Sequence, residues 1–261
     1  MTRRMVAVLF ALAFIVTIPG PPAVGQVGFK STTILQSQTT VTGQPIEFPL
    51  FRNQFTGILL ELAPGGETGV HLHPFPLAVI VLEGTVTVEM EGHPPGVFNA
   101  GQAFVETINT FHNGFNRGTV PMKALLVFAG EEGKAPLVWR AGATPVGLKA
   151  TPVIQTKTTV IGQPIAFPLW GKDQLSVVAI EITPGGQAGR HQHPVPTFVY
   201  VLEGTGFTVE VEGHGQRVYS AGQAYAESMN TWHNAFNRGT GLAKVLVVFA
   251  GEDGVPNSIR P

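Results

Sequence analysis

Two pairs of histidines in the sequence have the spacing of metal ligands. His71 and His73 are separated by one residue, and His191 and His193 repeat this arrangement further along the chain. Each pair follows a glycine-rich segment and precedes an apolar run, which is typical of a strand that follows a turn. Because side chains alternate between the two faces of a strand, both histidines of a pair point to the same side. Two neutral imidazoles on one side can bind a single metal ion.

The segments around the two pairs belong to a longer internal repeat. Three short segments recur, namely 39–46 at 158–165, 81–85 at 201–205 and 115–119 at 236–240. The offset grows from 119 (163 − 44) to 121 (222 − 101) in single steps, which loops can absorb. Such self-similarity indicates a duplicated folding unit. We therefore predict an N-terminal domain over residues 26–145 and a C-terminal domain over residues 146–261.

The hydrophobic pattern within each unit has the period of β-strands. Apolar and polar residues alternate over residues 86–91 (VTVEME) and over residues 207–212 (FTVEVE). Residues 77–82 and 124–129 are continuous apolar runs, as expected for strands that are buried on both faces. The 32 glycines and 21 prolines supply many turns, and no amphipathic helix follows residue 25. The sequence therefore predicts an all-β fold.

Composition excludes several classes of function. The net charge is −1 and there is no basic tract, which argues against nucleic acid as a partner. The absence of cysteine excludes disulfides, thiolate metal sites and thiol catalysis. With 44% hydrophobic residues, the chain can bury a substantial core.

The N-terminal segment has the pattern of a signal peptide. Arg3 and Arg4 precede an apolar run over residues 5–18, and a Pro/Gly-rich break and small residues follow. We expect residues 1–25 to be removed by cleavage after Gly25, which makes the protein secreted or periplasmic with no stable membrane span. The alternative is an uncleaved N-terminal membrane anchor.

The spacing of these motifs resembles that of the cupins. The first cupin motif has a glycine, five residues, His-x-His and a closing glycine. The second has a glycine, five residues, Pro-x-Gly, two residues, a histidine, three residues and an asparagine. In this chain Thr107-Ile108-Asn109 and Ser228-Met229-Asn230 stand in place of Pro-x-Gly. The matching residues are Gly65, His71, His73, Gly84, Gly101, His112 and Asn116 in the first copy and Gly185, His191, His193, Gly204, Gly222, His233 and Asn237 in the second. The chain thus resembles a bicupin over nearly all of its length beyond residue 25. The resemblance implies two tandem jelly-roll β-barrels.

The resemblance also implies a metal site in each barrel. The ligands would be the three histidines of each copy, which are His71, His73 and His112 in one and His191, His193 and His233 in the other. The family's usual fourth ligand is a glutamate, but Leu77 and Thr197 stand at its positions. A set of three neutral imidazoles favours Fe, Zn or Cu over Mn, which prefers oxygen ligands.

Two glutamates near the second motif are candidate catalytic residues. Glu106 and Glu227 stand six residues before His112 and His233. Either carboxylate could replace the missing ligand or act as a general acid or base. The alternative is a glutamate at the end of a strand that faces solvent or accepts a backbone amide.

We expect a secreted, metal-binding bicupin whose function the sequence leaves open. One hypothesis is a metal-dependent dioxygenase or related oxidoreductase acting on a small molecule, an aromatic one being an option, by analogy with quercetinase-like bicupins. The alternative is a non-catalytic protein that binds a metal or small ligand, and a storage or structural role is a third option. Whether the protein is an enzyme is not decided. The sequence is also compatible with a homo-oligomer.

Overall fold

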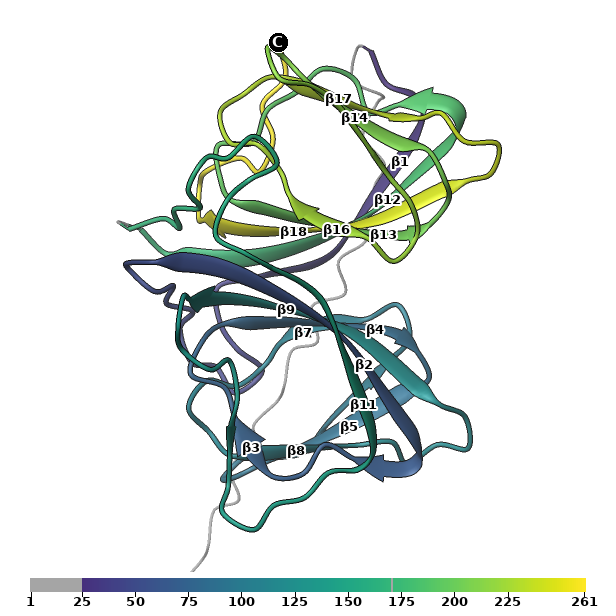
Figure 1. The fold of residues 1–261 in the computed structure, drawn as a ribbon. Coiled ribbons are helices and arrows are strands. Elements are labelled where there is room, and N and C mark those ends of the chain that lie inside the picture. The colour runs from purple at the N-terminus through teal and green to yellow at the C-terminus, as the bar shows by residue number, and fades with distance from the viewer. Residues whose placement is uncertain (1–24, 170) are drawn as a thin grey trace, which may run out of the picture.

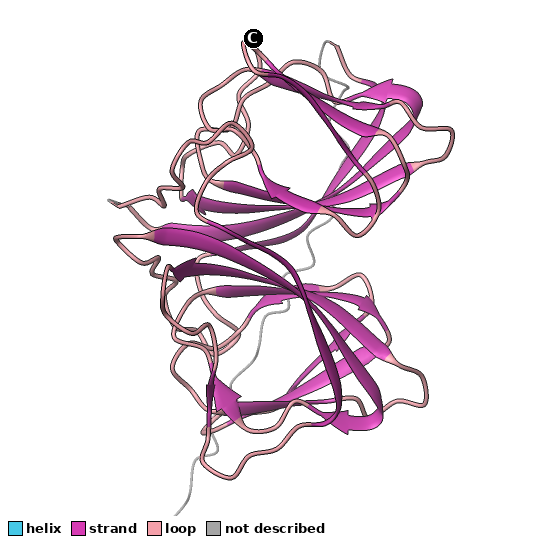
Figure 2. Ribbon diagram, viewed as in Figure 1, coloured by secondary structure: helices cyan, strands magenta, loops and turns pink. Residues whose placement is uncertain are grey.

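The computed structural model describes residues 25–169 and 171–261, and these ranges contain strands, turns and loops (Figure 2). The predicted all-β fold is confirmed. The predicted signal peptide lies outside the described residues except for Gly25. Over the described ranges, no helix is long and apolar enough to cross a membrane.

Ten strands form the N-terminal sheet, with the order β10-β3-β8-β2-β9-β4-β7, where β11 pairs with β2 and β5 pairs with β6 and β8. Their bounds are β2 Asn53–Glu67, β3 His71–Leu72, β4 Leu77–Glu83, β5 Thr85–Met90, β6 Gly96–Asn99, β7 Ala103–Val105, β8 His112–Phe115, β9 Met122–Glu131, β10 Val138–Trp139 and β11 Val146–Thr156.

Eight strands form the C-terminal sheet, with the order β15-β14-β17-β12-β18-β13-β16, where β1 pairs with β12. Their bounds are β1 Val27–Ser37, β12 Asp173–Gln187, β13 Thr197–Glu203, β14 Phe207–Val211, β15 Gly215–Tyr219, β16 Ala224–Ala226, β17 His233–Asn237 and β18 Ala243–Glu252. Each sheet curves into a barrel, which confirms the predicted pair of jelly rolls (Figure 1).

The first strand of each repeat joins the sheet of the other repeat. Strand β1 pairs antiparallel with β12, and β11 pairs antiparallel with β2. Figure 1 shows β1, in purple, within the barrel that is otherwise green and yellow. The domain boundary after residue 145 therefore stays a prediction about the sequence repeats. Each folded barrel also includes one strand from the other repeat.

The burial of the strands follows the hydrophobic pattern of the sequence. In β5, Val86, Val88 and Met90 are buried while Glu89 is exposed. In β4, the continuous apolar run from Leu77 to Val81 is buried throughout, because its side chains point alternately into the core of the barrel and into a core that contains residues of both repeats. The apolar side chains of both sheets therefore fill the barrels.

A shared hydrophobic core joins the two barrels. It contains buried residues from both repeats. The centroid of the Phe55 ring lies 5.3 Å from that of Phe167 and 6.0 Å from that of Phe198. Two hydrogen bonds cross the same interface. The amide of Phe167 donates to Asn53 Oδ1 at 2.7 Å, and the amide of Phe48 donates to Asp173 Oδ2 at 2.5 Å. The two barrels thus form one packed unit.

Candidate metal centres

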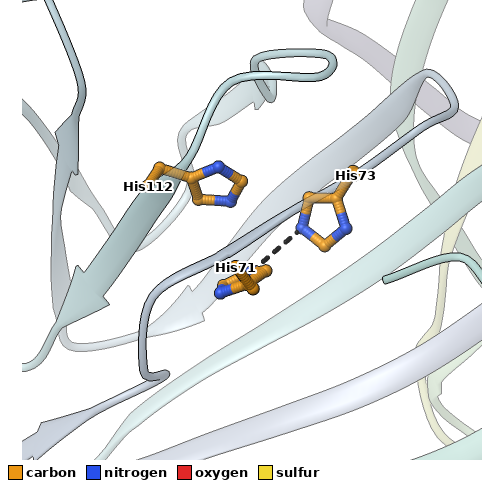
Figure 3. A group of neighbouring side chains, drawn as sticks. All are labelled: His71, His73 and His112. Atoms are coloured by element: carbon orange, nitrogen blue, oxygen red, sulfur yellow. Dashed lines mark hydrogen bonds between the residues drawn. The ribbon is translucent and has the colours of Figure 1, made fainter. Parts of the chain in front are cut away.

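The first histidine triad is assembled from two paired strands. His71 lies in β3 directly opposite His112, the first residue of β8, and His73 follows β3 by one residue. All three side chains are buried, and one nitrogen of each lies within 4.8 Å of the others. Figure 3 shows the three rings turned toward one another. The structure therefore brings together the three residues that the motifs predict as ligands.

Backbone carbonyls fix which nitrogen of each ring carries the proton. A carbonyl oxygen can only accept, so the Nδ1 atom that contacts it must donate. Each Nε2 atom of a neutral ring is then left with a lone pair. The acceptors for His71, His73 and His112 are the carbonyl oxygens of Gly69, Pro136 and Thr110, at 2.7, 2.9 and 2.9 Å.

The second triad repeats this arrangement. His191 bridges to His233 as His71 pairs with His112, and His193 completes the group, again within 4.8 Å. The acceptors for the Nδ1 atoms of His191, His193 and His233 are the carbonyl oxygens of Gly189, Asn257 and Thr231, at 2.7, 2.7 and 2.9 Å. Orientation of ligand imidazoles by a backbone carbonyl is typical of metal sites in proteins.

The donor set fits a transition-metal ion. Nε2 of His71 lies 3.2 Å from Nε2 of His73, which places two lone pairs face to face (Figure 3). Nε2 of His112 and of His233 are buried without a hydrogen-bond partner among the described residues. Unpartnered buried lone pairs are costly, and a metal ion that accepts all three would satisfy them.

Burial keeps the imidazoles neutral, as metal binding requires. Desolvation, with a contribution from the neighbouring histidine of each triad, lowers the pKa of His71 to about 4 and of His191 to about 3. The same causes lower the pKa of His73 and His193 well below the usual value. At neutral pH these rings present free lone pairs rather than protons.

A strained turn places the third histidine of each triad. Asn109 and Asn230 have φ of 53° and 50°, in the left-handed region that asparagine tolerates better than most residues. Both stand where the second cupin motif has a glycine. Their amides donate to the carbonyl oxygens of His73 and His193 at 2.8 Å, which ties the turn to the histidine pair.

Glu106 lines a cavity together with the three histidines of the first triad, and Glu227 lines a cavity together with His191 and His193. Both are buried, so the solvent-facing alternative is wrong, whereas the backbone-amide alternative is confirmed, because each Oε1 accepts the amide of the following residue. Oε2 of Glu227 lies 4.0 Å from Nε2 of His233 and accepts the hydroxyl of Tyr225 at 3.1 Å. Burial raises the pKa of Glu106 to about 7. Both glutamates are thus buried inside their barrels beside the histidines.

The positions of the missing fourth ligand supply no ligand atom. Leu77 is buried against the first triad and lines its cavity. The hydroxyl of Thr197 donates to the carbonyl oxygen of Val195 at 3.0 Å, so its proton is already engaged in a hydrogen bond to the backbone. The two triads therefore remain the groups of potential ligand atoms that the described residues bring together.

Sequence reasoning missed the difference between the two cavities. The cavity beside the first triad has a volume of about 50 Å³, and the one beside the second about 400 Å³. It also missed Arg260 and the residues of β1, which line the larger cavity. Aligning the ends of the two repeats would have placed Arg260 opposite Trp139, and the pairing of β1 with the other repeat left no signal in the sequence.

Several aromatic residues near the two motifs do not line the cavities beside the triads. Phe198 is in the core between the barrels. Phe111 and Trp232 stack under the guanidinium groups of Arg140 and Arg190, at 4.1 Å in each case. Trp170 lies outside the described residues.

Replacement of Glu106 by Gln is expected to stabilise the metal-free protein at pH 8. Because the folded-state pKa of about 7 exceeds the ordinary 4.5, folding at pH 8 keeps a buried charge that glutamine removes. The gain should be about 1–3 kcal/mol at pH 8 and should vanish near pH 4, where the carboxyl is protonated in both states. Urea unfolding at both values measures it, with exposed Glu47→Gln as the control. An E106Q protein less stable than the parent at pH 8 would contradict the assigned burial effect.

A comparison with protein-family models identifies the fold family. A model described as a cupin domain matches residues 58–128 and 178–249, together more than half of the chain. The chain belongs to the cupin family. Because one match falls in each barrel, it is a bicupin, as the motifs predicted. A search of curated proteins found no match to this bicupin.

Solved structures share the bicupin fold at low sequence identity. Oxalate decarboxylase of Lactobacillus farciminis, in a formate complex, is 15% identical with a TM-score of 0.60, over 92% of this chain and 89% of that one. Oxalate decarboxylase of Bacillus subtilis, which has Mn(II) centres, is 14% identical with a TM-score of 0.56, over 92% and 80%. Vicilin of Corylus avellana (hazelnut) is 12% identical with a TM-score of 0.55, over 79% and 76%. At these identities the likeness shows the fold alone.

Proposed function

We propose that this bicupin binds one divalent transition-metal ion in each barrel. The observation that carries the proposal is the set of six Nδ1 contacts to backbone carbonyls, which leaves the Nε2 lone pairs of each triad within one small buried volume. A metal ion held there would supply Lewis-acid or redox chemistry at an open coordination position. The chain itself supplies the ligands, their tautomers and the exclusion of water.

The proposed metals are Fe, Zn or Cu. Neither triad includes a carboxylate, and the residues at the fourth-ligand positions are Leu77 and Thr197. Imidazole suits these three metals, whereas Mn favours oxygen ligands. The Mn(II) centres of the Bacillus subtilis relative do not support this choice, so elemental analysis decides between the two groups.

Metal content is the direct test of the triads. We expect about two metal ions per chain in the parent protein, about one in H73A, about one in H193A and none in the double variant, measured by elemental analysis after dialysis. Exposed His93→Ala and His214→Ala serve as controls and should retain both ions. Metal content that does not change in H73A and H193A would contradict the proposal.

We propose that the C-terminal barrel acts as an oxidoreductase centre on a small molecule, with Glu227 as the proton carrier. Its support is the 4.0 Å separation between Glu227 and the Nε2 atom of His233, beside a cavity large enough for a ligand. Oxygen consumption by the metal-loaded protein, with E227Q for comparison, tests this. The second candidate, metal binding without catalysis, is favoured for the N-terminal barrel by its cavity of about 50 Å³.

We also propose export of the protein with cleavage after Gly25. Strand β1 begins at Val27, so cleavage at this point would keep the strand that completes the C-terminal barrel. A mature protein whose first residue is Gln26, identified by N-terminal sequencing, is the expected result.

A further inference from the structure

The two barrels differ in the size of their side chains around the triad. Four residues that line the first cavity are replaced by smaller ones at the corresponding positions of the second repeat. These pairs are Thr68 and Ala188, Leu77 and Thr197, Met122 and Ala243, and Leu126 and Val247. The register of the strands matches the pairs, since Leu77 and Thr197 face Phe128 and Phe249. Other lining positions carry larger side chains in the second repeat, since Val86, Gly114 and Ala124 correspond to Phe207, Ala235 and Val245, so the two cavities differ in shape as well as in volume.

The two cavities differ in the size of the ligand that they can hold. The first cavity, at about 50 Å³, holds one or two water molecules at ~30 Å³ each. The second, at about 400 Å³, lies in the range of small-molecule sites, roughly 300–1,000 Å³. A ligand larger than a few atoms can therefore enter only the C-terminal barrel.

Arg260 occupies the place that Trp139 holds in the first barrel. In each barrel a segment near the end of the repeat pairs with the strand of the first two histidines, through Trp139 with His71 and through Ile259 with Gln192. A Cβ atom on Gly69 would lie 3.1 Å from the ring of Trp139, and one on Gly189 would lie 3.2 Å from Nη1 of Arg260. Where the first barrel has an indole 5.6 Å from the His71 ring, the second has a cation.

The charge of Arg260 has no counterion among the described residues. The side chain is half-buried and lines the second cavity, and its Nη1 donates to the carbonyl oxygen of Ala188 at 2.9 Å, but no carboxylate of the described residues pairs with it. Burial lowers its pKa, as expected for a cation without a partner. The charge also acts on the triad, because it contributes to the lowered pKa of His191 and His193.

Another polar group in the cavity has no hydrogen-bond partner among the described residues. The hydroxyl of Ser258 is buried, lines the cavity and makes no hydrogen bond to any described residue. A buried hydroxyl without a partner is unusual and indicates a ligand or ordered water. Arg260 and Ser258 come from the same short segment, two residues apart, and both line the cavity with side chains that carry hydrogen-bond donors.

The remaining walls of the cavity are largely apolar. Phe29 of β1, Val199 of β13, Phe207 of β14 and Phe249 of β18 line it. A ligand that fits this cavity must therefore bring one anionic group to Arg260 and an apolar body to the walls. A small dianion would leave most of this apolar surface uncovered.

We propose that the C-terminal barrel binds a monocarboxylate with an apolar body. Its carboxylate accepts hydrogen bonds from Arg260 and Ser258, and its body packs against the apolar walls beside the second triad. The inference deepens the proposed function, because it names the ligand class of the barrel assigned there as the reacting one. The N-terminal barrel takes no part in this binding.

Benzoate is the probe for this site, with binding to the parent chain measured by calorimetry at pH 7.5. We expect one benzoate per chain, binding at least ten-fold weaker in R260Q, and at least ten-fold weaker binding of neutral benzamide and of oxalate to the parent. R190Q is the matched control, since Arg190 lies on the outer face and pairs with Glu212, and it should bind benzoate like the parent. R260K, which keeps the charge but loses the planar donor pair, should be intermediate.

The outcomes separate this inference from the proposed metal sites. A protein with two metal ions that binds no benzoate, or that binds it equally well in R260Q, overturns the inference and leaves the metal proposal intact. Oxalate that binds more tightly than benzoate overturns the assigned ligand class. A metal-free parent that still binds benzoate through Arg260 supports the inference, while the absence of metal in the purified protein refutes the metal proposal.

Discussion

Acidification of the metal-free protein from pH 7.5 to pH 5 is expected to lower its free energy of unfolding by about 4 kcal/mol or more. In the unfolded chain each histidine takes up a proton below its ordinary pKa of 6.5, but in the folded protein His71 and His191, with pKa values of about 4 and 3, stay neutral at pH 5. Each contributes about 1.4 kcal/mol per pH unit, or about 2 kcal/mol over this range. His73, His193 and His112 have lowered pKa values and act in the same direction.

Glu106 opposes part of this loss. Its folded-state pKa of about 7 means that the folded protein gains relative stability as the pH falls from 7 toward 4.5. The loss should therefore be larger in E106Q than in the parent. Urea unfolding after chelation, at intervals between pH 5 and pH 8, measures both profiles. The exposed His93→Ala is the control and should leave the slope unchanged, while a flat profile in E106Q would show that the triads are not held neutral by the fold.

Bound metal and protons compete for the same lone pairs. A metal ion that binds the folded protein adds stability by mass action, about 4 kcal/mol per site when the free metal is a thousand times its dissociation constant. Because the ligands must be neutral, this contribution also fades as protons bind the imidazoles at low pH. Acid should thus release metal and unfold the protein over one range of pH.

The ligand residues could be predicted because their signal is local. His71 and His73 share a side of the chain through the alternation of a strand, and the spacing to His112 is that of a known family motif. The turn before His112 departs from that motif, yet Asn109 still adopts the left-handed conformation that a glycine would take. This part of the site could therefore be predicted, because it depends on residues that are close together in the sequence.

The features that distinguish the two barrels could not be predicted from local patterns. Arg260 reaches the second triad through the pairing of a terminal segment with Gln192, and β1 reaches the cavity across roughly 150 residues of chain. The larger cavity is lined by residues of strands that are far apart in the sequence, including β1, and the side chains around the two triads change size in both directions. These properties depend on long-range packing, which the alternation of apolar and polar residues along a strand does not report.

Loss of strand β1 is expected to damage the C-terminal barrel, although the strand is at the N-terminal end of the chain. A protein that begins at Gln38 lacks every pair from Val27 with Gln187 to Ser37 with Leu175. It also lacks Phe29, Ile34 and Leu35, which pack partly buried against the cores. Full burial of such side chains contributes roughly 1.5–3 kcal/mol each, so the partial burial of three is worth on the order of 4 kcal/mol. We expect this protein to retain about one metal ion per chain, at the first triad, and to lose benzoate binding.

Two matched point variants test the exchange of strands without shortening the chain. Thr32 of β1 lies opposite Ala179, and Thr151 of β11 lies opposite Leu59, at corresponding positions of the two repeats. Proline at either position interrupts the strand and is poorly tolerated inside a sheet. T32P should lose the metal ion of the second triad and keep that of the first. Adding H73A to T32P should then remove the remaining metal ion, whereas adding H193A should change the metal content little. T151P should show the reverse pattern, because β11 completes the N-terminal barrel. If T32P instead empties the first triad, the strand does not belong to the sheet of β12 in solution.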